Sequence, residues 1–126
     1  MLITKIFLAI VGAAYLLLAA WCVARPQQTA GSVGFELKPG NGQSEYLVIY
    51  GGLQLALGLI FLAPLVREEY LPVALAACLL IHASLVAFRT VSFALYSGIP
   101  TTTYILAATE WLILLTAAWR FFWGGK

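Results

Sequence analysis

Four long apolar runs, separated by short polar breaks, dominate the pattern of hydrophobic and polar positions along the chain. They cover residues 3–24, 45–66, 70–96 and 102–122. A helix needs about 20 apolar residues to cross the hydrocarbon of a bilayer, and each run reaches that length. Open strands are excluded because unpaired backbone groups in lipid cost several kcal/mol each. The pattern therefore predicts a single all-α integral membrane domain.

The breaks between the runs carry residues typical of helix ends and turns. Arg25-Pro26 closes the first run, and the glycines and prolines that follow predict an outer loop over residues 25–44. The other two connections, at 67–69 and 97–101, are short. Short connections place consecutive helices side by side in opposite directions, so we expect an antiparallel four-helix bundle.

The distribution of basic residues predicts the orientation. An even number of spans puts both termini on one side of the membrane. That side carries more Lys and Arg than the other, with Lys5, Arg67, Arg120 and Lys126 against Arg25 and Lys38. By the positive-inside rule we expect both termini in the cytoplasm and the outer loop on the opposite side.

Composition narrows the class of protein further. The chain is 63% hydrophobic and 10% charged, whereas a soluble protein is about 45–50% apolar and about 25% charged. This excludes a soluble enzyme, a disordered tail and a disulfide-stapled module, and it makes the lipid bilayer the first partner. The net charge of +2 comes from scattered residues, so nucleic acid binding has no support.

Ionisable residues deep inside the runs cost roughly 2.5–3.5 kcal/mol each and therefore require partners. The sequence places Arg89, Glu110 and His82 there. Arg89 lies eight residues before Ser97, and Glu110 lies nine after Thr101. In an antiparallel hairpin both reach about 12 Å below the outer turn, at 1.5 Å per residue. We expect Arg89 and Glu110 to form an ion pair.

Counting across the second hairpin matches Glu45 to the level of Arg89 and matches two further polar residues to each other. Gln54 and His82 lie at one level of the second hairpin, and Gln54 belongs to a stripe with Tyr46, Tyr50 and Gly58 at spacings of four. Glu45 lies at the helix end, from which it can reach toward Arg89. The candidate ligand pocket therefore contains Tyr50, Gln54, His82, Arg89 and Glu110, with Glu45 at its mouth.

Two interpretations of this cluster stay open. It is either a small site for an anionic or polar ligand, with a proton relay as a variant, or a structural device. In the second case Arg89 and Glu110 neutralise one another and fix the helix register, while Gln54 and His82 make interhelical hydrogen bonds. Glycines such as Gly51 and Gly58 let backbones approach closely, within the bundle or in a homodimer.

Other chemistry finds little support in the sequence. Cys22 and Cys78 lie about 13 Å apart in depth, too far for a disulfide. His82 is the single histidine and lacks carboxylates or thiols at ligand spacing, so we expect no metal. Nucleotide-binding and hydrolase motifs are absent from the sequence. We therefore expect no cofactor and no enzymatic activity.

The stretch from Glu45 to Gly58, with its Tyr50-Gly51-Gly52 core, resembles the domain-of-unknown-function family 4345, small bacterial four-span proteins loosely similar to the DoxX group. Arg25-Pro26, Gly34-Phe35, Arg89, Gly98-Ile99-Pro100 and Glu110 are similar as well. The resemblance covers nearly the whole chain. It implies a bacterial inner-membrane location and the four-span topology. Some DoxX relatives are subunits attached to oxidoreductases, but this chain has no cysteine pair or cofactor motif for that chemistry.

Two functions follow as hypotheses. The first is an accessory or assembly subunit of the inner membrane that contacts another membrane protein. The second is a small transporter or ligand-binding membrane protein that uses the pocket around Arg89 and Glu110. A transporter of this size would need to form a homo-oligomer, because one packed four-helix bundle leaves little room for a translocation path.

Overall fold

The computed structural model describes residues 1–124, which are helical with short connections and contain no strand. Lys126 is one of the basic residues on which the predicted orientation depends, and it lies outside the described residues. The elements are α1 (Leu2–Ala24), α2 (Pro26–Ser32), α3 (Asn41–Tyr46), η1 (Leu47–Leu53), α4 (Gln54–Val66), η2 (Glu68–Tyr70), α5 (Leu71–Leu95) and α6 (Thr101–Trp123). Because α3, η1 and α4 follow one another without a break, they form one helical span over Asn41–Val66.

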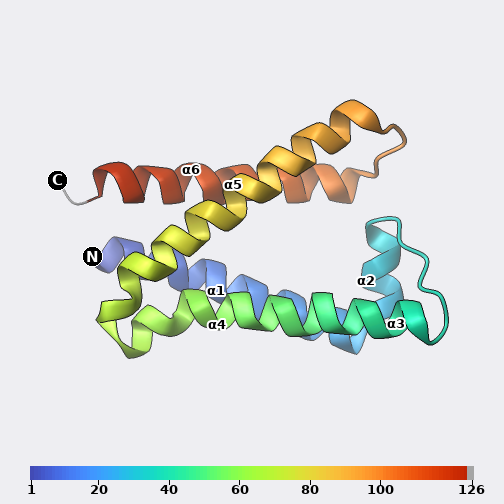
Figure 1. Ribbon diagram of the computed structural model, residues 1–126, viewed down its shortest axis with the longest axis horizontal. Coiled ribbons are helices and arrows are strands. Elements are labelled where there is room, and N and C mark those ends of the chain that lie inside the picture. The colour runs from blue at the N-terminus through green and yellow to red at the C-terminus, as the bar shows by residue number, and fades with distance from the viewer. Residues whose placement is uncertain (125–126) are drawn as a thin grey trace.

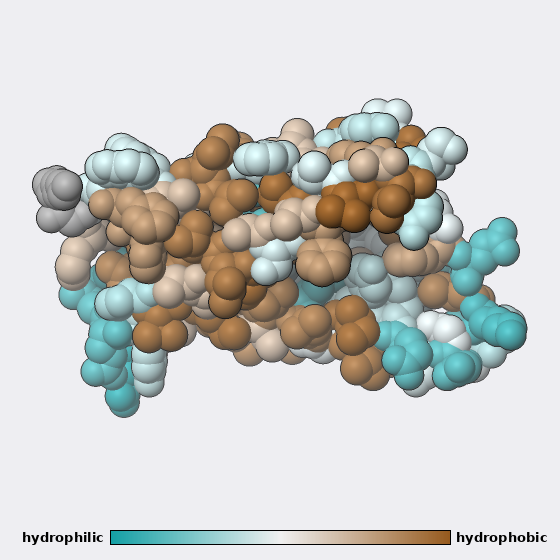
Figure 2. All heavy atoms as spheres, turned by 45° about the horizontal axis from the view of Figure 1, so that its top comes forward, coloured by the Kyte–Doolittle hydropathy of each residue, from teal (hydrophilic) through white to brown (hydrophobic). Residues whose placement is uncertain are grey.

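Four helices are long and apolar enough to cross a membrane: Leu2–Ala24, Asn41–Val66, Glu68–Leu95 and Thr101–Trp123. Figure 2 shows hydrophobic residues over the middle of the molecule and hydrophilic ones gathered at its two ends. This is the surface that a bilayer requires, since the hydrocarbon contacts the middle and water the ends. The prediction of an all-α, multi-pass membrane protein is confirmed.

The long helices pack as two antiparallel pairs. α1 packs along the helix formed by η1 and α4, and α5 packs along α6 (Figure 1). The start of α1 and the end of α6 lie at one end of the molecule, which we call the terminal end. The connection between α1 and α4 and the turn between α5 and α6 lie at the opposite end, the loop end.

The two pairs meet near the terminal end and separate toward the loop end. Leu8 and Val11 of α1, Phe61 of α4 and Cys78 of α5 belong to one buried apolar cluster. At the terminal end Lys5 forms an ion pair with Glu68. All buried residues of α5 lie at or before Val86, although the helix continues to Leu95. The last third of α5 therefore leaves the core, as Figure 1 shows.

The outer loop, residues 25–44, contains helical turns that its glycines and prolines did not predict. Pro26 occupies the first turn of α2, where a missing N–H costs nothing. Thr29 Oγ1 donates to the carbonyl of Arg25 at 3.0 Å and accepts a hydrogen bond from the Tyr46 hydroxyl at 2.8 Å. This side-chain link anchors α2 against α3. The second helical span, Asn41–Val66, begins four residues before the predicted start at 45.

The second span contains a π-helical segment, η1, and keeps one inward face through it. Tyr46 and Gly51 are buried, and half-buried Tyr50 packs against the buried cluster of Cys22, Ala30 and Tyr46. The α-helical spacing then resumes, and Gln54 and Gly58 are both buried. Three members of the predicted stripe, Tyr46, Gln54 and Gly58, are therefore buried, and Tyr50 is half-buried.

Candidate functional site

Arg89 of α5 and Glu110 of α6 form the predicted ion pair. The guanidinium Nε donates to Oε2 of Glu110 at 3.0 Å, and Nη2 donates to Oε1 at 2.5 Å. The pair is bidentate, which is the strongest geometry available to arginine and carboxylate. The Arg89 side chain is 27% exposed and that of Glu110 13%. The hairpin between α5 and α6 brings both residues to one depth, as counting from its turn predicted.

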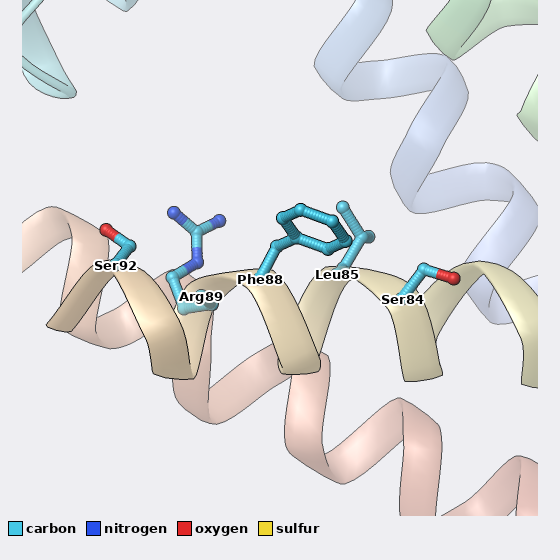
Figure 3. A pocket seen from close by; sticks show the side chains of 5 residues that line it. All are labelled: Ser84, Leu85, Phe88, Arg89 and Ser92. Carbon is cyan, nitrogen blue, oxygen red and sulfur yellow. The ribbon is translucent and has the colours of Figure 1, made fainter. Parts of the chain in front are cut away.

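Arg89 also lines a cavity of about 360 Å³, an open groove on the surface of α5, together with Ser84, Leu85, Phe88 and Ser92. All five residues belong to α5, at positions that share one face of a helix. Figure 3 shows Leu85, Phe88 and Arg89 projecting from the same side of α5. The ion pair is therefore not sealed inside the bundle, because one side of the guanidinium group borders an open space.

His82 lies in the interior, with none of its surface exposed. Its Nδ1 lies 2.8 Å from the carbonyl oxygen of Cys78. Because a carbonyl only accepts, Nδ1 carries the proton, and Nε2 is left to accept from the Tyr15 hydroxyl at 3.1 Å. The neutral imidazole thus has a partner for each ring nitrogen. It ties α5 to α1, and it does not line the cavity at Arg89.

Gln54 is buried and bonded within the first helix pair. Its Nε2 donates to the carbonyl of Tyr50 at 2.8 Å and contacts Cys22 Sγ of α1 at 3.8 Å. Gln54 and His82 therefore have separate partners, although sequence counting put them at one level. Both side chains hold α1 against its neighbours.

Tyr50 and Glu45 line a second cavity of about 220 Å³, at the loop end, beside Phe35 and Tyr46. The Tyr50 ring stacks on that of Tyr46 with centroids 4.4 Å apart and meets Phe35 edge-on at 5.9 Å. Glu45 is exposed, and the ion pairs formed among residues 1–124 do not include it. Of the six candidate residues, Arg89 thus lines the first cavity and Glu110 is bonded to it. Tyr50 and Glu45 line the second cavity, and His82 and Gln54 make separate buried hydrogen bonds.

A family described as a domain of unknown function, DUF4345, matches residues 3–122. The chain belongs to this family. No curated protein and no solved structure matches it. The match includes all six candidate residues, but the description of the DUF4345 family names no activity. The function of this DUF4345 protein must therefore be argued from the geometry of its own residues.

Sequence reasoning missed Tyr15 as a partner in the DUF4345 protein, although a signal was present. Tyr15 lies 13 residues after Leu2 and His82 lies 12 after Tyr70, and both helices start at the terminal end. The two side chains therefore reach the same depth. Thr29 was missed for a different reason, because no spacing rule predicts which loop hydroxyl meets Tyr46.

The thiols and carboxylates that the structure describes form no metal-binding group. Cys22 and Cys78 are both free and buried. Among residues 1–124, no three His, Cys, Asp or Glu side chains gather closely enough to hold a metal ion. The chemistry that the described residues offer is therefore hydrogen bonding and charge pairing, with Arg89 as the group that borders open space.

Proposed function

We propose that this DUF4345 protein is an accessory or assembly subunit of a larger complex in the bacterial inner membrane, and that α6 contacts the partner. One observation carries the proposal. α6 has the lowest mean hydropathy of the four spanning helices and also the smallest share of buried residues. α1 and α6 both contain 23 residues, yet six are buried in α1 and three in α6.

This combination is unfavourable for a helix that faces lipid on most of its surface. In a bilayer the more polar helix is expected to be the more covered one. The hydroxyls of Thr109 and Thr116 do not need a partner protein for this, because they donate to the carbonyls of Ile105 and Leu112 at 2.9 and 2.8 Å. Thr102, Thr109 and Thr116 lie seven residues apart on one face of α6, and the first two are exposed. Small and hydroxyl-bearing residues of this kind line helix interfaces in membranes. The expected partner is a transmembrane helix of another protein.

The buried polar residues support a scaffold more than a reaction centre. His82 bonds to Tyr15 and to its own helix, and Gln54 bonds within the first helix pair. Among residues 1–124, no buried side-chain nitrogen or oxygen lacks a hydrogen-bond partner. Interhelical hydrogen bonds of this type are worth about 0.6–2 kcal/mol each in membranes. Such bonds hold the helices in register for a partner.

Photo-cross-linking in native membranes tests this proposal. A photoreactive amino acid is placed at Thr109 on α6 and, as a matched control, at Leu17, which is 72% exposed on α1. We expect a discrete adduct with a second membrane protein from Thr109 and lipid adducts alone from Leu17. An adduct with the mass of two copies of this chain, or equal protein adducts at both positions, would contradict an accessory role through α6.

Ligand binding, including transport, is the second candidate, and one observation favours it. The guanidinium of Arg89 borders a cavity of about 360 Å³ instead of being enclosed by the bundle. A purely structural ion pair gains nothing from this opening, because exposure weakens the attraction between its charges.

A further inference from the structure

The cavity on α5 combines polar groups with apolar walls. Arg89 and Ser92 contribute polar atoms, and Leu85 and Phe88 contribute apolar surface. The Phe88 side chain is 79% exposed, beyond the last buried residue of its helix. The cavity therefore opens to the side, at the depth where lipid chains surround the protein.

Arg89 retains hydrogen-bond donors that the chain does not use. A guanidinium group has five N–H donors, and Glu110 accepts one from Nε and one from Nη2. Nη1 makes no hydrogen bond within residues 1–124. Every buried side-chain nitrogen and oxygen there has a hydrogen-bond partner, so Nη1 is not a buried atom. Its two N–H groups therefore reach the accessible surface. The Ser92 hydroxyl also makes no side-chain hydrogen bond within residues 1–124. It is therefore a second donor beside the same cavity.

The charge of the ion pair decides which acceptor fits these donors. Arg89 and Glu110 together carry no net charge, and the Glu110 oxygens already lie 2.5 and 3.0 Å from the guanidinium. A carboxylate or phosphate ligand would place a second anion beside Glu110 in a medium of low dielectric constant, which is costly. A neutral carbonyl oxygen accepts an N–H without adding charge.

We propose that this cavity binds a neutral amphiphile, whose ester or amide carbonyl accepts a hydrogen bond from Arg89 and whose apolar chain lies against Leu85 and Phe88. The inference rests on the second candidate function and is independent of the partner contact on α6. A membrane glycerolipid and a free fatty ester both carry this chemistry. Glu110 neutralises the guanidinium and fixes its plane through the bonds from Nε and Nη2, which leaves Nη1 without a partner within residues 1–124.

Thermal unfolding of the purified protein in dodecyl maltoside tests the proposal, because that detergent has no carbonyl. The probes are methyl laurate for a free ester, dilauroylglycerol for a lipid, sodium laurate for an anion, and dodecane for a chain without an acceptor. At about 100 times Kd we expect one of the two esters to raise Tm by about 5–10 °C. We expect no comparable shift with laurate or dodecane.

Variants locate the site. Phe88→Ala removes a wall without touching the ion pair, and the double variant Arg89→Met/Glu110→Gln removes the guanidinium without stranding a charge. Both should abolish the shift, whereas Val91→Ala, an exposed neighbour outside the cavity, should keep it. A larger shift with laurate than with the esters, no shift with either ester, or a shift that survives Phe88→Ala would overturn the proposal. None of these results depends on a protein partner.

Discussion

Arg89 and Glu110 show how charged side chains are accommodated inside membrane-spanning helices. Each alone would place an uncompensated charge in a medium of low dielectric constant, and together they form two hydrogen bonds. His82 and Gln54 avoid the same penalty by a different route, since their bonds go to Tyr15, to Cys22 and to backbone carbonyls. Depth in the membrane was enough to predict the pairing of Arg89 with Glu110, because α5 and α6 are consecutive and lie next to each other.

The ion pair predicts a specific pattern of stability. Arg89→Met or Glu110→Gln alone should lower the free energy of unfolding by about 3–5 kcal/mol, because the remaining group is left without its partner. The double variant should lose less than the sum of the two. Unfolding of the three variants and the wild type in detergent measures this coupling. Additive losses would show that the two side chains do not act as a pair.

At the scale of elements, close backbone contact holds the first helix pair together. Gly12 of α1 and Gly58 of α4 face each other, and a Cβ atom built on Gly58 would lie 2.7 Å from Leu16 Cδ2 and 3.0 Å from the Gly12 carbonyl oxygen. A Cβ on Gly51 would meet Val23 of α1 at 2.8 Å. The glycines that the sequence offered for a homodimer therefore pack within the chain.

Substitutions at two glycines of the second span, one packed against α1 and one in open space, test this packing. Gly58→Ala should destabilise the protein by about 1–3 kcal/mol, because the methyl group overlaps α1. Gly52→Ala is the matched control, since a Cβ there has no atom within 4 Å. It should be neutral or stabilise by about 0.4–1 kcal/mol through reduced chain entropy. Detergent unfolding curves compare the two, and equal effects would rule out a tight contact at Gly58.

At the scale of the whole molecule, the two helix pairs are joined at the terminal end and diverge at the loop end. Lys5 pairs with Glu68, and Arg120 Nε of α6 donates to Thr4 Oγ1 of α1 at 2.9 Å. Both contacts lie near the chain termini, where hydrophilic residues face water. The divergence leaves the last third of α5 and much of α6 open to lipid or to a partner.

The orientation in the membrane is a prediction at this scale. Basic residues favour the terminal end, so both termini should be cytoplasmic and the loop between α2 and α3 should face the opposite side. Alkaline phosphatase fused after Lys126 should be inactive, and the same enzyme inserted after Lys38 should be active. Lys38 is exposed in the loop between two short helices, so the insertion leaves the spans intact. The reverse activities would invert the assigned orientation.

The sequence by itself determined the spans, their antiparallel order and the pairing of Arg89 with Glu110. Hydrophobic run length and distance from a tight turn are local quantities, and both can be counted along the chain. Tertiary structure decided the partners of His82 and Gln54, the place of Tyr50 and the shape of the cavity at Arg89. These depend on the rotation and separation of helices that are not neighbours in a tight hairpin. Packing against α1 and α4 sets the point, Val86, beyond which α5 has no buried residue, so counting at a constant 100° per residue could not predict it.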